Sequence, residues 1–490
     1  MNFSMMNKTA VRRMLLLALA LFLAAHAFCV FNRTFSANSV MVDVSRSSQA
    51  LTASGSYLQP IYWRVRGSLS SPMLVGLLSC LYLSGTILLL CMLLNFSGIF
   101  PTFALCGIVM LGSPMLSLFA GSLHTADASL LSLFLSVAAA FLCLRTRRGW
   151  MLSALLVAAS LALDPSGLSS FFAPVLLALM RRILGGESVS VSRLLSAACA
   201  GAAAVCLYLI GYVLFLKRAG LDASAVLHLS GSLGGAFLKP ILLPFQPLTA
   251  YPVLNVLLRA LLLALTAFSL VLLCHRLSLK AMGALIVCMV LLPLAVNLPV
   301  FSETAPGQAP LSFVFVDLAL VLVIAEGLRS FHEESNLRFV AIGALGILFL
   351  GSIVFSNQVY LKKNLEYQST LSAMTRVFDR AERVPGYTPG ITPVAVIGTL
   401  EDSPIAANHL GFERMRALDA AKTDTLITSS DGMIWYTWEL LGYPCNFLST
   451  YEQEQMTLLP AVKAMEPYPA ASSCQLVDGV MVIKLSEAQD

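Results

Sequence analysis

Charged side chains are scarce in this sequence. Asp, Glu, Lys and Arg together make up 12% of it, against about 25% in ordinary soluble domains, and hydrophobic residues make up 58%. The apolar residues fall in repeated runs near the length of a membrane span. The composition therefore excludes an ordinary soluble protein and predicts an all-α polytopic membrane protein.

Several chemical signatures are also missing. The sequence has no Cys/His spacing typical of a zinc site, no glycine-rich phosphate-binding loop and no nucleic-acid-binding motif. We therefore expect no nucleic-acid partner and assign no metal site or cofactor. A divalent cation held by Asp43, with Asp127 as a second ligand, is left open.

Eleven hydrophobic segments are expected to form the membrane part. They are residues 14–31, 73–94, 102–120, 128–144, 150–163, 168–180, 194–216, 251–273, 281–300, 311–328 and 339–356. The fifth and sixth are shorter than the roughly 20 residues that cross a bilayer upright, and the turn-forming Asp164-Pro165-Ser166-Gly167 separates them. They are predicted as two short tilted helices or as a re-entrant pair. The first segment is expected to be an uncleaved anchor rather than a signal peptide.

The distribution of Lys and Arg indicates the orientation, because cytoplasmic loops carry an excess of them. A cytoplasmic N-terminus places most of these residues inside, namely Lys8, Arg12, Arg13, Arg145, Arg147, Arg148, Arg181, Arg182, Arg193, Arg276, Lys280, Arg329 and Arg338. The exceptions lie in the first outer loop and in residues 217–240. An odd number of spans then places the C-terminal tail on the outer side.

That tail differs in character from the rest. We expect an amphipathic helix over residues 357–384, strands over 392–400 and 479–485, and helices over 415–421 and 432–441. The predicted organisation is a membrane module, residues 1–356 with a first outer loop at 32–72, followed by an outer α/β domain, residues 357–490. Cys445 and Cys474 in this domain form either a disulfide or two buried thiols.

The first outer loop contains a single acid, Asp43, three residues before Arg46. Asp43 is either a solvated or Arg46-paired carboxylate or a general base that takes a proton from an attacking hydroxyl. The outer cations Arg64, Arg66, Lys217 and Arg218 either extend to lipid head groups or bind a phosphate at the outer surface. Arginine favours the second alternative because its guanidinium offers paired donors to phosphate oxygens.

Other polar residues occur next to spans or inside them. His124 and Asp127 are a candidate pair for a proton, a metal or a sugar hydroxyl, although Asp127 is also a candidate helix cap, as is Asp164. Asp317 lies inside the tenth predicted span, where a carboxylate usually faces a cavity or a partner. Arg259 in the eighth span is the expected partner, in a structural or a functional ion pair.

The order of these features resembles the Gtr-type bacterial glucosyltransferases that modify O-antigen, within the wider GT-C architecture. In those enzymes the first outer loop has an acidic pair with an arginine three residues on. Asp43 and Arg46 correspond to the second acid and the arginine, and Val42 stands in the place of the first acid. The similar segments are Val42-Asp43-Val44-Ser45-Arg46, Tyr62-Trp63-Arg64-Val65-Arg66-Gly67, Ala126-Asp127-Ala128-Ser129, Val394-Ala395-Val396-Ile397-Gly398, Leu440-Leu441-Gly442-Tyr443, Met465-Glu466-Pro467-Tyr468-Pro469 and Val482-Ile483-Lys484-Leu485-Ser486.

The resemblance implies a function. It implies a glycosyltransferase in the bacterial inner membrane that moves a sugar, with glucose expected, from a polyprenyl-phosphate donor to a periplasmic glycan such as O-antigen or lipopolysaccharide. Asp43 would be the catalytic base of an inverting displacement. Arg46, Arg64, Arg66, Lys217 and Arg218 would hold the donor phosphate, and His124, Asp127 and Asp164 would support the acceptor. The alternatives are a transporter or flippase for a lipid-linked saccharide, which would use Arg259 and Asp317, and a non-catalytic membrane scaffold.

Overall fold

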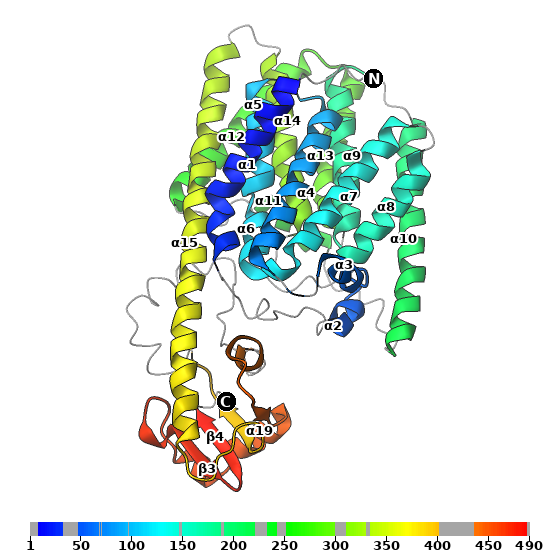
Figure 1. Cartoon of the computed structure of the whole chain (residues 1–490). Helices are drawn as coiled ribbons and strands as arrows, with labels where there is room; N and C mark the ends of the chain where they lie inside the picture. The colour runs from blue at the N-terminus through cyan, green and yellow to red at the C-terminus, as the bar shows by residue number, and fades with distance from the viewer. Residues whose placement is uncertain are drawn as a thin grey trace.

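The computed structural model shows a bundle of long helices with a small α/β domain at one end (Figure 1). It describes residues 8–32, 48–67, 69, 71–96, 98–146, 149–187, 191–220, 233–242, 251–298, 310–329, 334–400 and 436–487. Asp43 and Arg46, as well as the helix expected over residues 415–421, lie outside these residues.

The bundle consists of helices that match the predicted spans. They are α1 (Lys8–Phe31), α4 (Pro72–Leu94), α5 (Ile99–Leu111), α6 (Ser113–Gly121), α7 (Leu123–Arg145), α8 (Gly149–Leu163), α9 (Gly167–Leu184), α10 (Val191–Ala219), α12 (Pro252–Cys274), α13 (Leu279–Val296), α14 (Val314–Arg329) and α15 (Glu334–Glu382). With α5 and α6 taken as one helix and α14 counted from Leu311, 10 helices within the described part of the chain are long and apolar enough to cross a membrane. The shorter α8 adds a further apolar segment, and the predicted polytopic all-α membrane protein is confirmed.

The helices run alternately up and down the bundle, which gives it two distinct ends (Figure 1). We call the end where α1 begins the N face and the end that carries the α/β domain the domain face. The turn at residues 164–166, between α8 and α9, reverses the chain at the domain face. The fifth and sixth predicted spans are thus two helices, α8 and α9, joined by this turn. The long polar connection after α1 begins and ends at the same face.

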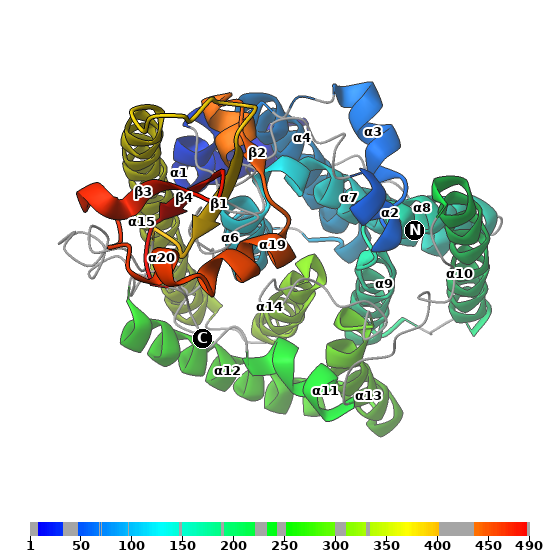
Figure 2. The same cartoon turned by 90° about the horizontal axis from the view of Figure 1, so that it is seen from below.

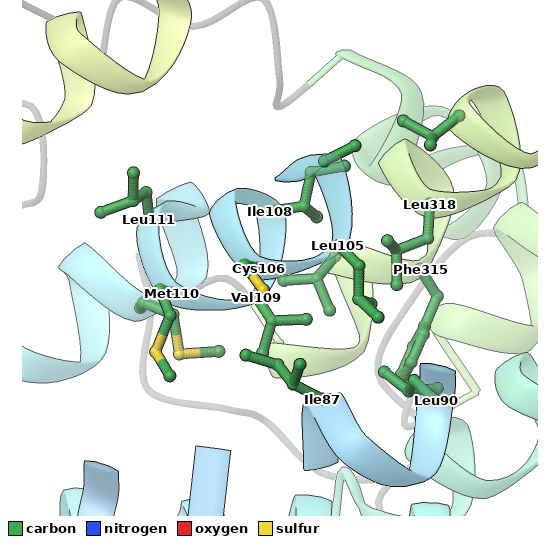
Figure 3. Packing of buried hydrophobic residues seen from close by; sticks show 14 of the residues in the cluster. Ile87, Leu90, Leu105, Cys106, Ile108, Val109, Met110, Leu111, Phe315 and Leu318 are labelled. Carbon is green, nitrogen blue, oxygen red and sulfur yellow. The ribbon is translucent and has the colours of Figure 1, made fainter. Parts of the chain in front are cut away.

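A continuous apolar core holds the bundle together. It is centred on α5, whose residues from Ala104 to Leu111 are all buried. Figure 3 shows Val109 facing Ile87 of α4, and Phe315 of α14 facing Leu90 of α4. Because almost every side of α5 is covered by other helices, α5 acts as the central element of the bundle.

A buried histidine fastens α1 to this core. His26 is 1% exposed; one ring nitrogen lies 2.7 Å from the Tyr360 hydroxyl of α15, and the other lies 3.0 Å from the Met110 carbonyl of α5. Its ring stacks on Phe119 of α6 at 4.5 Å. Burying a ring nitrogen without a partner costs free energy, so these contacts favour one arrangement of α1, α5 and α15.

Helix α15 joins the bundle to the α/β domain. It is 49 residues long, or about 73 Å at 1.5 Å per residue, which is more than twice the roughly 30 Å of a bilayer core. The helix expected over residues 357–384 is confirmed as far as Glu382, and it is one element with the eleventh predicted span, a continuity that was not predicted. The sequence changes from apolar to mixed without a proline or glycine break between Ser352 and Glu382, so the helix continues.

The α/β domain is built on a four-stranded sheet in the order β2-β1-β4-β3. Its strands are β1 (Pro393–Ile397), β2 (Asn446–Phe447), β3 (Cys474–Val477) and β4 (Val480–Lys484). β1 runs parallel to β2 and β4, and β3 is antiparallel to β4. Val394 and Val396 face the end of α15, whereas Ala395 and Ile397 face α19 (Thr450–Thr457) and α20 (Pro460–Lys463). The predicted α/β domain is confirmed.

Details of this domain differ from the sequence-based expectations. The described part of the helix expected over 432–441 is only a short π-helical turn, Tyr436–Leu441. β3 and α19 were missed, although the Asp478-Gly479 pair, with positive φ angles of 48° and 80°, is a typical hairpin signal. Cys445 and Cys474 are free buried thiols. Burial raises the pKa of Cys445 to about 12, so this thiol is protonated at neutral pH.

Candidate functional site

Two short helices from the connection between α1 and α4 lie across the domain face. They are α2 (Ser48–Ala53) and α3 (Gln59–Arg66). Figure 1 shows α3 nearly end-on and Figure 2 shows it from the side, so its axis runs across the spans. The loop with the candidate acid thus ends in a folded structure on the bundle.

Hydrogen bonds to α8 and α10 fasten these helices. The Leu58 amide donates to the Ala162 carbonyl at 2.9 Å, and the Gln59 side-chain amide donates to the Leu163 carbonyl at 2.7 Å. They satisfy carbonyls that the end of α8 leaves without helical partners. On α10, the Tyr208 hydroxyl donates to the Gly55 carbonyl and the Tyr212 hydroxyl donates to the Ala53 carbonyl.

An ion pair between Arg66 and Asp127 joins α3 to α7. Arg66 Nη1 lies 2.8 Å from both carboxylate oxygens of Asp127 and 3.3 Å from the His124 carbonyl. The side chains of Arg66 and Asp127 are 2% and 0% exposed. This sequestered pair has the geometry of a structural brace.

Tyr62 completes the environment of the carboxylate. Its hydroxyl donates to Asp127 Oδ2 at 2.9 Å and lies 3.3 Å from the Tyr82 hydroxyl. Burial and the neighbouring negative charge raise the pKa of Tyr62, so the phenol keeps its proton and remains a donor. Next to it, the buried ring nitrogens Trp63 Nε1 and His124 Nδ1 have no hydrogen-bond partner among the described residues.

The candidate phosphate-binding residues separate into two groups. Arg66 makes the buried pair, whereas Arg64, at the same end of α3, and Lys217 and Arg218, at the end of α10, are exposed at the domain face. Exposed cations at a membrane surface are available to an anionic ligand or to lipid head groups. The fifth candidate, Arg46, lies outside the described residues.

Neither candidate helix cap caps its helix. Asp164 Oδ1 accepts a hydrogen bond from the Ser166 amide at 2.9 Å, but the N-cap of α9 is Ser166 itself, so Asp164 stabilises the turn before α9. The interpretation of Asp127 as a cap was wrong, because α7 begins after Ser122 and the Asp127 carboxylate turns toward Arg66 instead. The pairing of Asp127 depends on a helix 61 residues away in sequence, and no local pattern reveals it.

A second polar site lies inside the bundle. Arg259 Nη1 of α12 lies 3.3 Å from Asp317 Oδ1 of α14, as the sequence led us to expect. Asn255, one helical turn before Arg259, accepts a hydrogen bond from Arg259 Nε at 3.3 Å. All three residues line a cavity of about 240 Å³. Asn255 was missed by the sequence analysis, although its i, i+4 spacing to Arg259 was a readable signal.

The site therefore offers anchored loop helices, exposed cations and an internal charged cavity. Among the described residues there is no group of three or more His, Cys, Asp or Glu side chains that would hold a metal ion. Comparisons of this chain with protein-family models, curated proteins and solved structures found no match.

Proposed function

We propose that this chain is an integral-membrane glycosyltransferase that transfers a sugar, with glucose expected, from a polyprenyl-phosphate donor to a glycan. The observation that carries the proposal is the docking of α2 and α3 on the domain face. Residues 33–47, which include Asp43, are bounded by Asn32 at the end of α1 and by Ser48 at the start of α2. The described segments on either side of Asp43, the end of α1 and the start of α2, both lie at the face that carries the α/β domain and the exposed cations.

The proposed reaction is a single displacement. A hydroxyl of the acceptor glycan attacks the anomeric carbon and gives its proton to the Asp43 carboxylate. The new carbon–oxygen bond forms as the bond from carbon to phosphate oxygen breaks, so the configuration inverts and the lipid phosphate leaves with the electron pair. Arg64, Lys217 and Arg218 would stabilise this developing negative charge. Arg66 would instead hold α3 in place.

The proposed location follows from the charge distribution. Described cations near the N face include Arg145, Arg181, Arg276 and Arg329, which supports a cytoplasmic N face. The domain face would then be periplasmic in the inner membrane of a bacterium. A polyprenyl tail would lie in the bilayer, and the α/β domain would guide the acceptor glycan.

The test compares surface glycans of cells that carry the wild-type chain, an Asp43→Asn variant or no chain, by mass and linkage analysis. We expect a hexose branch with the wild type and at least a hundredfold less of it with Asp43→Asn, since a general base contributes about 10²–10⁴ in rate. Asp379→Asn, a surface change on α15, is the control and retains the branch. An undiminished branch in the Asp43→Asn cells, at equal protein level, would refute the assignment.

A transporter or flippase of a lipid-linked saccharide is the second candidate. The observation in its favour is the charged cavity at Arg259 and Asp317, since intramembrane ionisable residues often mark a transport pathway. Proteoliposomes distinguish the two functions. A transferase forms a glycosidic bond from donor and acceptor on one side, whereas a transporter moves the donor across the bilayer and leaves it intact.

A further inference from the structure

The cavity beside Arg259 lies among α5, α12, α13, α14 and α15, with α11 (Leu233–Leu242) contributing Ile241. Its volume is about 240 Å³ and most of its lining is apolar. The polar lining residues are Ser113, Asn255, Arg259, Asp317 and Ser352. It is thus an apolar chamber with a small polar group on its wall.

The polar group lies toward the domain face. α14 begins at that face with Val314, beside the end of α13 and the start of α9, to which Ser312–Val296 and Leu298–Ser169 hydrogen bonds connect this region. At 1.5 Å per residue, Asp317 is about 5 Å along α14, and Arg259 contacts it from α12. Apolar lining residues such as Ile324 and Leu345 lie deeper. The lining of the chamber is therefore charged toward one membrane surface and apolar toward the middle of the bilayer. Such a lining matches a ligand with a polar head and an apolar chain.

The ion pair in the chamber is only loosely made. Arg259 and Asp317 meet at a single 3.3 Å contact, and their side chains are 21% and 23% exposed. The Arg66–Asp127 pair, in contrast, has two 2.8 Å contacts and is almost completely buried. Within the described residues, Arg259 makes one further hydrogen bond, the 3.3 Å contact with Asn255. Since a guanidinium carries five N–H donors, Arg259 has donors left for a ligand.

The volume limits what can enter. A cavity of about 150 Å³ accommodates a benzene ring, so about 240 Å³ accommodates on the order of ten heavy atoms by the same measure. That is enough to enclose a phosphate and the first part of one chain, and too little to enclose the phosphate, the glycerol and the first parts of both chains of a glycerophospholipid. Arginine is well suited to phosphate because its paired donors match two phosphate oxygens.

We propose that this chamber binds the phosphate and the first chain segment of a single-chain lipid phosphate. Arg259 exchanges its weak contact with Asp317 for the phosphate, Asn255 keeps the guanidinium oriented, and the apolar walls hold the chain. The inference rests on the proposed function for the natural ligand, the polyprenyl phosphate that sugar transfer releases. Binding is measured without sugar transfer, however, so the two proposals can fail separately.

The test uses the full-length chain in a non-ionic maltoside detergent, with radiolabelled farnesyl phosphate as the probe. We expect saturable binding that dodecyl phosphate displaces and that the uncharged farnesol displaces at least tenfold more weakly. Dioleoyl phosphatidylglycerol, with two chains, is expected not to displace the probe. Phosphatidylglycerol or farnesol competing as well as dodecyl phosphate would overturn the proposal, as would the absence of saturable binding.

Variants connect the binding to the ion pair. Arg259→Gln is expected to raise the dissociation constant at least tenfold, and Arg259→Lys, which keeps the charge but loses the fork of donors, to raise it less. Asp317→Asn removes the internal competitor and is expected to lower it several-fold. Lys280→Gln, exposed at the N face, is the matched control with unchanged affinity. An unchanged affinity in folded Arg259→Gln protein, or equal losses in the Arg259→Gln and Asp317→Asn variants, would show that the pair is purely structural.

Discussion

The ion pairs Arg66–Asp127 and Arg259–Asp317 have the same two residue types but different surroundings. Arg66 and Asp127 are buried, and the carboxylate also accepts a hydrogen bond from Tyr62. Arg259 and Asp317 share one longer contact at the wall of a cavity. Desolvation makes a buried charge dependent on its partner, whereas a partly exposed charge can exchange partners at lower cost. We therefore assign the first pair to structure and the second to binding.

The structural role of the first pair is testable with Asp127→Asn. This change leaves the buried Arg66 without its counter-charge, and breaking a buried pair costs about 3–5 kcal/mol. We expect a clear fall in the apparent melting temperature of the detergent-solubilised protein. Asp379→Asn, which breaks an exposed pair with Arg383, is the control, with an expected loss below about 1 kcal/mol. Equal melting temperatures for the two variants would contradict the assignment.

At the scale of elements, close packing between α5 and α15 positions the long helix that carries the α/β domain. Gly107 of α5 faces the ring of Phe349 of α15, and a Cβ at this position would overlap that ring. Phe349 is 7% exposed and also lines the cavity. A side chain at residue 107 would therefore push the two helices apart and disturb the chamber.

Gly107→Ala is expected to destabilise the protein by about 1–3 kcal/mol, as overpacking of a core does. The matched control is Gly343→Ala on α15, where a Cβ meets nothing within 4 Å and the gain in helix propensity is about 1 kcal/mol. Thermal melting in detergent is the measurement. A melting temperature for Gly107→Ala at or above that of the wild type would show that the two helices separate without cost.

At the scale of the whole molecule, the arrangement of the helices separates two surfaces. The N face collects the start of α1 and the ends of α4, α7 and α9, and the domain face collects α2, α3 and the sheet (Figure 1). The cavity's polar residues lie in the half of the bundle near the domain face. In the proposed reaction, the lipid-bound donor and the acceptor would meet at the domain face.

Reporter fusions test this sidedness in bacterial cells. Alkaline phosphatase joined after Gly220 or Glu487 is expected to be active, because those points lie on the periplasmic side in the proposed orientation. The same enzyme joined after Gly186, at the N face, is expected to be inactive because it stays in the cytoplasm. The opposite pattern of activities, at comparable fusion levels, would reverse the proposed orientation.

Hydrophobic run length and turn residues determined much of the fold. The predicted spans correspond to helices because only a helix satisfies its own backbone hydrogen bonds within hydrocarbon. The nearly continuous apolar runs at residues 393–397 and 480–484 also predicted the strands β1 and β4. The continuity of α15 was not predicted, because the change from apolar to mixed composition marks the membrane boundary and not the end of a helix.

The sequence by itself determined the membrane class, the number of apolar segments and which charged residues lie near or inside them. It paired Arg259 with Asp317 because each charge would be costly alone in a span. Only the tertiary structure decided that Arg66 belongs to Asp127, that Cys445 and Cys474 are separate buried thiols, and that Arg259 faces a cavity. Those outcomes depend on which helix surfaces meet, and contacts between residues far apart in sequence leave no periodic pattern along the chain.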